Sequence, residues 1–273
     1  MHFSRNLPTM SQSSKHIPFS STHVFSKLIN DYLEGKGTAL DFVQYAPNLE
    51  GYRTAIEGRK KHPINRGLLF DVLTKQYANL PQENAVNNQI ALLKKDNTFV
   101  VTTAHQPNLF TGPLYFFYKI IHAIQLAASL KTAFPEYNFV PVYYMGSEDA
   151  DLEEVGSFNL DLKNYQWATK QTGAIGRMQV DDNLLKLLQQ LESYWTILPQ
   201  GQKALEILKV AYQKGKTISE ATLSFVHAFF GSKGLLVLQP DDAALKAAFI
   251  PVMEKEILTG FSHKAIQPTI TAL

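Results

Sequence analysis

The chain has 273 residues, 45% of them hydrophobic, and 26 Lys and Arg against 24 Asp and Glu give a formal charge of +2. This composition is typical of a globular protein with a sizeable core, and no basic run with interleaved aromatics favours nucleic acid as a partner. The absence of cysteine excludes disulfides, a thiolate nucleophile and a cysteine-ligated zinc site. No signal-peptide core and no membrane-spanning apolar run is apparent, so we expect a cytoplasmic protein without a membrane partner.

The N-terminal third is predicted to be a tail followed by a helical arm. Residues 1–21 are rich in Ser, Pro and His and are expected to form a flexible tail. Residues 22–96 are expected to form the arm, because apolar residues recur at helical spacing along them. The predicted helices cover 24–33, 51–59, 64–80 and 84–94.

A strand–helix–strand pattern begins the next part, residues 97–156. The apolar run 99–103 ends in a polar turn, a helical stretch follows, and 139–145 is a second strand that looks buried. Residues 233–273 return to the same core, with a third strand at 234–238 and a helix that Pro251 is expected to break or kink. These elements predict an α/β fold built on an open parallel sheet. Only three strands are visible, and further elements that would cover this sheet are missing. We therefore expect apolar side chains of this last helix to lie partly bare.

Residues 157–232 differ in composition and are predicted to be an inserted connecting segment of mixed α/β structure. Alternating polar and apolar residues in 158–167 and 176–180 indicate a half-exposed hairpin between these two stretches. Three helices are expected after it, by period, in 184–194, 202–212 and 217–230.

A polar turn follows the first strand at the carboxyl edge of the sheet, where open parallel sheets bind ligands. It offers side-chain donors, a glycine that permits close approach and a lysine two turns into the helix. These candidates are His105, Gln106, Asn108, Thr111, Gly112 and Lys119. The turn matches neither a Walker A nor a GxGxxG motif. It could hold phosphate, or it could be a helix cap beside a half-buried histidine.

An acidic turn follows the second strand and should face the same crevice. Glu148 and Asp149 lie nearest the strand end and are the candidate catalytic residues together with His105, while Ser147 and Asp151 are candidates for substrate binding. Such carboxylates could bind an amine, hold Mg²⁺ or act as a general base. Alternatively, they collect there because the dipole of a helix favours acids at its N-terminus. No metal site is assigned.

These turns carry a resemblance to a known family. AHQPNLFTGPLYFFYK, followed by VPVYYMGSEDADLEEV, resembles the bacillithiol biosynthesis cysteine-adding enzymes (BshC), which have a GQQ-type turn, LLTGPLYT, and a VPVFW strand leading to a SEDHD-type turn. GLLVLQPDDAALKAAFIPVMEKEIL resembles the family's next strand and helix. Two departures concern the site, since His105 stands where many members have Gln and Ala150 where many have His.

The resemblance implies a nucleotide-binding-like (Rossmann-like) core with an N-terminal helical arm, an inserted connecting segment and a C-terminal coiled coil that forms a homodimer. It covers about the first half of the family's length, so the coiled coil is absent and we expect a truncated product or a fragment.

The implied activity is an amide-forming ligase, or the N-terminal portion of one, that joins L-cysteine to the amine of glucosaminyl-malate. The activating cofactor stays open, with ATP or another nucleotide as a candidate. By this resemblance the first turn would contact phosphate or the activated carboxyl, and Glu148, Asp149 and Asp151 would hold an amine or a metal. Two alternatives stay open: a non-catalytic small-molecule-binding remnant, and a nucleotidyltransferase-like enzyme with a degenerate HxGH turn at His105.

Overall fold

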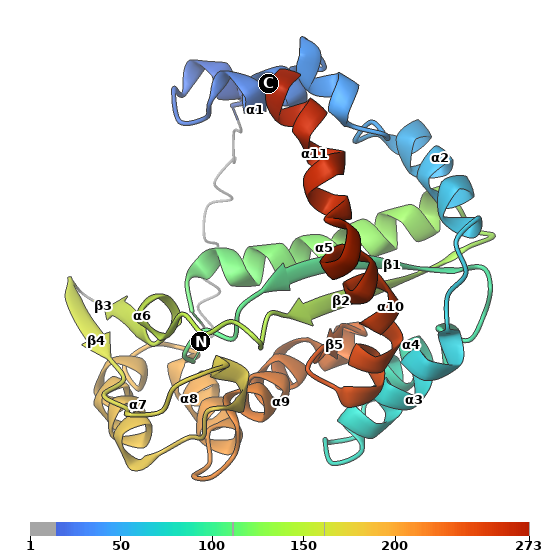
Figure 1. The fold of residues 1–273 in the computed structure, drawn as a ribbon. Helices are drawn as coiled ribbons and strands as arrows, with labels where there is room; N and C mark the ends of the chain where they lie inside the picture. Colours follow the sequence, from blue (N-terminus) through green and yellow to red (C-terminus); the bar gives the residue numbers. More distant parts are fainter. Residues whose placement is uncertain (1–14, 111, 161, 273) are drawn as a thin grey trace, which may run out of the picture. The chain divides into compact units, whose positions relative to one another are not determined.

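The computed structural model describes residues 15–110, 112–160 and 162–272 (Figure 1). The chain divides into two compact units, one formed by Met1–Lys61 with Thr259–Leu273 and the other by His62–Leu258. Most of the predicted N-terminal tail lies outside the described residues. The boundary between the units falls inside the helical arm expected from the sequence.

The smaller unit is helical in its described part. It contains α1 (Lys27–Glu34), α2 (Leu49–Lys60) and α11 (Phe261–Ala272), with 3-10 turns η1 (Phe19–Ser21) and η2 (Thr38–Phe42). Helix α1 ends at Gly35, which adopts a positive φ of 67° that is favourable for glycine. The Asn48 side chain caps α2 by accepting the Gly51 N–H at 2.9 Å. Both helices were predicted from the sequence, whereas α11 was not.

A three-stranded parallel sheet forms the centre of the larger unit. Its strands are β1 (Thr98–His105), β2 (Asn138–Met145) and β5 (Leu236–Leu238), in the order β1-β2-β5. Helix α5 (Leu114–Ala133) connects β1 to β2 and packs along both strands (Figure 1). The three predicted strands and the parallel α/β architecture are therefore confirmed, and both polar turns follow strand ends at the carboxyl edge.

Aromatic side chains fill the space between the sheet and two helices. Phe116 of α5 contacts the fully buried Tyr143 of β2, with ring centroids 5.2 Å apart. Phe117 of the same helix contacts Phe229 of α9 (Ile218–Phe230) at 5.6 Å. Burial of such rings is the largest source of apolar stabilisation in a core of this kind. These ring contacts pack α5, β2 and α9 against one another.

Other parts of this unit expose apolar side chains. Val100 of β1 is 49% exposed, and Tyr144 of β2 is 38% exposed. Helix α10 (Ala243–Thr259) follows β5 and passes through Pro251 without ending there. Its exposed apolar residues include Phe249, Ile250, Val252 and Ile257. The expected partly bare helix is confirmed.

Helices α3 (Arg66–Tyr77) and α4 (Asn84–Leu92) pack with the sheet unit. The buried Tyr77 hydroxyl accepts the Val237 N–H at 2.7 Å. The Gln76 side chain donates to the Gln239 carbonyl at 2.8 Å and accepts the Gln239 N–H at 3.1 Å. Helix α3 thereby satisfies backbone groups of β5 and of the residue that follows it.

The stretch predicted as an inserted segment, residues 157–232, follows α6 (Leu152–Val155). It contains β3 (Ser157–Leu160), β4 (Lys163–Gln166), the 3-10 turn η3 (Ile175–Arg177), α7 (Asp182–Trp195) and α8 (Gly201–Ala211). It continues through α9 and the 3-10 turn η4 (Gly231–Lys233). The three predicted helices are confirmed. Helix α9 begins with a capping box in which Thr217 and Glu220 exchange hydrogen bonds.

The predicted hairpin was wrong in its pairing. β3 and β4 pair with each other inside the first alternating stretch, and Leu162 supplies the left-handed turn with φ 64°. In the second stretch, Gln179 forms an isolated bridge to Thr217 instead. The reason is tertiary: Gly176 donates its N–H to the Ser147 carbonyl at 2.9 Å, which holds that stretch at the acidic turn.

Candidate functional site

The two polar turns meet at the carboxyl end of the sheet. The Gly146 N–H donates to the His105 carbonyl at 2.9 Å, and the Tyr143 hydroxyl donates to the same oxygen at 2.9 Å. Beyond these bonds, the Gln106 amide donates to Asp149 Oδ2 at 2.9 Å and to Glu154 Oε2 at 3.2 Å. One side-chain amide therefore joins the first turn to two carboxylates of the acidic turn.

His105 is half-buried between the rings of Tyr115 and Phe116, whose centroids lie 5.2 and 5.7 Å from its own. Burial, and then the charge of Lys119, lowers its pKa from the usual value, while Glu154 acts in the opposite direction. The imidazole is therefore neutral near pH 7. Its Nε2 lies 2.9 Å from Asn108 Nδ2, and with the amide donating, Nε2 is the acceptor and Nδ1 carries the proton.

The remainder of the first turn is shaped by Gly112 and Lys119. Gly112 has φ 59°, and a Cβ there would lie 2.7 Å from Asn108 Cβ, so a side chain would be strained and would displace Asn108. Lys119 Nζ donates to the Ala104 carbonyl at 2.5 Å, which leaves two ammonium protons for other acceptors. Thr111, also predicted for this site, lies outside the described residues.

Three predicted residues of the acidic turn have distinct local roles. Asp149 Oδ1 accepts the Asp151 N–H at 3.0 Å, and the hydrogen bond from Gln106 is the main cause of a lowered Asp149 pKa. Asp151 Oδ1 accepts the Glu154 N–H at 3.1 Å and so caps α6. Ser147 is 1% exposed, and its hydroxyl is buried without a hydrogen-bond partner among the described residues. Of these three side chains, Asp149 is the one bonded across to the first turn.

Glu148 belongs to a different group, an ionic network formed with Lys246, Asp241 and Arg177. Lys246 Nζ lies 2.6 Å from Glu148 Oε1 and 2.6 Å from Asp241 Oδ1. Arg177 binds Asp241 bidentately, with Nε to Oδ2 at 2.5 Å and Nη2 to Oδ1 at 2.7 Å. Hydrogen bonding to Arg177, and then to Lys246, lowers the pKa of Asp241 to about 2. This network covers the β2 and β5 ends of the sheet.

Sequence reasoning missed both cations of this network. The neighbouring Asp242 accepts the Ala244 N–H through its side chain at 2.9 Å. Lys246, one turn into the helix that follows β5, could have been found from that position. Arg177 could not, since 64 residues separate it from Asp241.

Residues 13–273 match the protein family described as "Bacillithiol biosynthesis BshC, N-terminal Rossmann-like domain". The chain belongs to this family. It is 38% identical over 262 residues to the "Putative cysteine ligase BshC" of Flavobacterium johnsoniae, covering 94% of this chain and 49% of that protein. The Cytophaga hutchinsonii protein of the same name is 38% identical over 247 residues, which are 90% of this chain and 45% of the relative.

The chain thus spans about half the length of the curated relatives it matches. More distant similarity extends to a protein of the same name from Salinibacter ruber, 27% identical over 265 residues. In the described part of the chain, no helix has the length and hydropathy needed to cross a bilayer. The described residues also contain no group of three or more His, Asp or Glu side chains arranged to hold a metal ion.

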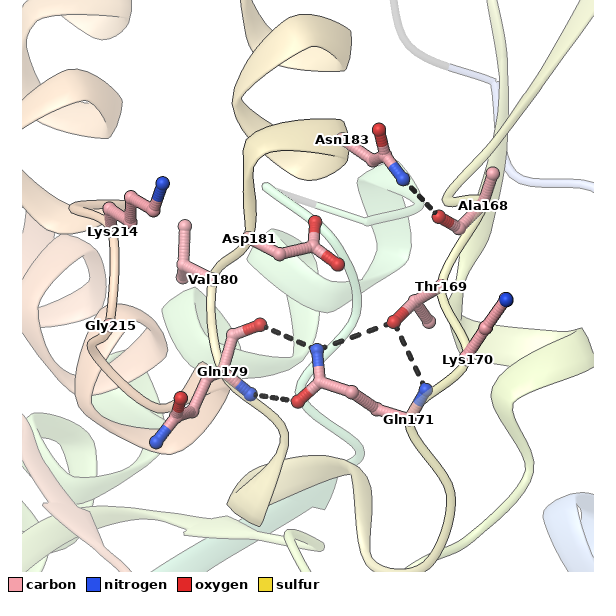
Figure 2. A pocket seen from close by; sticks show the side chains of 10 residues that line it. All are labelled: Ala168, Thr169, Lys170, Gln171, Gln179, Val180, Asp181, Asn183, Lys214 and Gly215. Atoms are coloured by element: carbon pink, nitrogen blue, oxygen red, sulfur yellow. Dashed lines mark hydrogen bonds between the residues drawn. The ribbon is translucent and has the colours of Figure 1, made fainter.

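One hollow within residues 157–232 and another beside that stretch are lined by neither Glu148 nor Asp149. The larger, about 950 Å³, lies between the loop after β4, the start of α7 and the loop after α8 (Figure 2). Figure 2 shows the Gln171 side chain bonded to the Gln179 backbone, accepting at 2.7 Å and donating at 2.9 Å. The smaller hollow, about 190 Å³, is mainly apolar and includes Gly112, Phe158 and Trp195 in its lining. Gly112 is the predicted site residue that reaches it.

Proposed function

We propose that this chain is the N-terminal part of a cysteine ligase that joins the carboxyl group of L-cysteine to the amine of glucosaminyl-malate. Family membership supports the reaction class, and the names of the relatives support cysteine as a substrate. The observation that supports this location of the site is the pair of hydrogen bonds that Gln106 donates to Asp149 and Glu154.

That arrangement favours an ammonium ligand. Asp149 and Glu154 have no ion-pair partner in the described ranges 15–110, 112–160 and 162–272, whereas Glu148 is paired with Lys246. An amide donor can hold two carboxylates together but does not neutralise their charge. A substrate ammonium would provide that charge and make charge-assisted hydrogen bonds, which are about twice as strong as neutral ones. We therefore assign amine binding to the Asp149 side of the acidic turn.

The first turn fits an anionic or activated carboxyl group. Gly112 keeps the turn free of a side chain, and Lys119 has two ammonium protons beyond its bond to Ala104. A bound nucleotide would supply the activation of the cysteine carboxyl, and His105, Asn108 and Lys119 are the residues that would hold its anionic part. Neutral His105 is the candidate to take the proton that the amine loses when its nitrogen attacks the carboxyl carbon, once its Nε2 is released from the Asn108 amide.

The proposal includes a cytoplasmic location and a homodimeric full-length protein. The absence of cysteine is compatible with a reducing compartment.

The direct test is incubation of the chain with L-cysteine, glucosaminyl-malate and ATP, followed by mass spectrometry for the coupled thiol. Titration calorimetry with each compound separates binding from chemistry. The coupled product, lost in Asp149→Asn and kept in Asp182→Asn, would support the ligase. The control residue Asp182 is an exposed carboxylate paired with Lys214.

Other outcomes identify the alternatives. Binding of L-cysteine or glucosaminyl-malate without product would indicate a binding protein instead. Nucleotidyl transfer from ATP without coupling would favour the degenerate HxGH turn at His105. Absence of both binding and product would contradict the proposal for this chain.

A further inference from the structure

The side chains of the ionic network at the β2 and β5 ends of the sheet differ in their exposure to solvent, although their formal charges cancel. Glu148, Asp241, Arg177 and Lys246 sum to zero charge. The Asp241 side chain is 15% exposed, whereas those of Arg177, Glu148 and Lys246 are 67%, 46% and 42% exposed. Asp241, at the centre, is therefore covered, and both cations face solvent beside Glu148.

Unused donors remain on Arg177. Its Nε and Nη2 atoms bind the two Asp241 oxygens, so one edge of the guanidinium is engaged. Nη1, at the other edge, has no hydrogen-bond partner among the residues that the structure describes. A guanidinium has five N–H donors in a planar fork that matches a carboxylate or a phosphate. The bond to Asp241 fixes the plane of that fork and leaves its outer edge free.

Lys246 adds a further donor beside it. Its Nζ lies 2.6 Å from both Glu148 Oε1 and Asp241 Oδ1, which uses two of the three ammonium protons. Both Asp241 oxygens are occupied, so Glu148 Oε2 is the carboxylate oxygen of the network without an ionic contact among the described residues. The remaining hydrogen-bonding capacity is thus mostly that of donors, which is what an oxyanion requires.

Two backbone hydrogen bonds hold the turn that precedes Arg177 against the acidic turn, in addition to the ion pair of Arg177 with Asp241. The Ile175 N–H donates to the Asp149 carbonyl at 2.8 Å, and the Gly176 N–H donates to the Ser147 carbonyl at 2.9 Å. A Cβ on Gly176 would lie 2.5 Å from Ser147 Cβ and 2.3 Å from Ser219 Oγ. The turn is therefore seated in a space that accepts glycine alone without rearrangement, and Arg177 follows directly.

We propose that Arg177 and Lys246 form a subsite for an oxyanion of the substrate, a carboxylate or a phosphate, and that Asp241 is the positioning residue that orients Arg177. This inference rests on the proposed function, because the subsite adjoins the acidic turn assigned to the substrate amine. Asp149 and Glu154 would hold the cationic part of a ligand and Arg177 its anionic part, on the two sides of one turn.

The test measures anion binding by the chain itself, independently of coupling. Titrations with L-malate and with inorganic phosphate, each followed by NMR and calorimetry, are carried out on the wild type, Arg177→Gln and Lys246→Gln. We expect Arg177→Gln to weaken binding of the recognised anion about tenfold or more, which corresponds to one charge-assisted bidentate contact. Lys214→Gln is the matched control, since Lys214 is an exposed lysine in an ion pair with Asp182, and it should bind as the wild type does.

The two anions distinguish the sources of the ligand. Saturable binding of malate alone assigns a carboxylate, and binding of phosphate alone assigns a phosphoryl group. Equal affinity of the wild type and Arg177→Gln for both anions, or no saturable binding by the wild type, would overturn the subsite. If Arg177→Gln does not fold, Arg177→Lys and Lys246→Gln decide the question by the same comparison. Failure of coupling with anion binding intact would count against the ligase and not against the subsite.

Discussion

Glu148 and Asp149 are neighbours in the chain but belong to different hydrogen-bond networks. Asp149 lies with Glu154 around the Gln106 amide, so that side of the acidic turn keeps its negative charge. Glu148 lies against Lys246 and, through it, shares the ion pair of Asp241 with Arg177. Both residues lie beyond the end of β2 at Met145, where the turn directs one side chain to Lys246 and the other to Gln106. One short turn can therefore serve an ammonium on one side and an oxyanion on the other.

The largest expected effect is a loss of stability in Gly176→Ala, whose added methyl group would clash beside the ionic network. The added Cβ would lie 2.5 Å from Ser147 Cβ, and overpacking of this kind costs about 1–3 kcal/mol of unfolding free energy. Urea unfolding measures the loss. The control is Gly67→Ala, where a Cβ would meet a single atom at 3.8 Å and a helical Gly→Ala change is stabilising. Equal stability of Gly176→Ala and the wild type would contradict the tight seating of η3.

A smaller effect, with a clear pH dependence, is expected for Asp241→Asn. The folded-state pKa of Asp241 is about 2, below its unfolded value of about 3.9. Its stabilising contribution is fully present above the unfolded pKa and is lost as pH falls through the folded pKa. Urea unfolding between pH 6 and 2, values chosen to bracket this window, should show the wild type losing its advantage over Asp241→Asn as the carboxylate protonates. A constant difference across that range would show that Asp241 does not carry this linkage.

The third comparison sets Asp149→Asn against Glu148→Gln in ligand binding. We expect Asp149→Asn to weaken binding of L-cysteine or glucosaminyl-malate about tenfold, because it removes a charge-assisted partner of the amine. Glu148→Gln should weaken binding less, since its charge is already offset by Lys246. Both variants should keep the melting temperature of the wild type, because Glu148 is exposed and Asp149 is only half-buried. Loss of stability in parallel with loss of binding would favour a structural role for these acids.

The smallest expected effect comes from His105→Gln. Burial lowers the His105 pKa, so the unfolded chain binds a proton more readily than the folded one as pH falls below about 6.5. The wild type should therefore lose stability between pH 7.5 and 5, a range chosen around that value, and His105→Gln should lose less. Melting temperatures across this range provide the measurement. An identical pH dependence in both proteins would mean that His105 titrates as it does in the unfolded chain.

Local sequence determined the elements of this protein. Apolar runs located β1, β2 and β5, and helical periodicity with glycine and capping signals located α1 and α9 close to their observed bounds. These features depend on neighbours a few residues apart, which is why a sequence shows them. The position of polar turns after parallel strands followed from the same patterns, and with it the meeting of Gln106 and Asp149.

Tertiary structure decided which partners the side chains found. Arg177 reaches Asp241 across 64 residues because the η3 turn is bound to the acidic turn at Gly176, and no local period encodes that contact. The same docking buried Ser147 and withdrew the second alternating stretch from the predicted hairpin. The turn after β2 directs Glu148 and Asp149 to different networks. Local periodicity thus placed the carboxylates at the sheet edge. Long-range packing determined which of them has its charge offset by a cation.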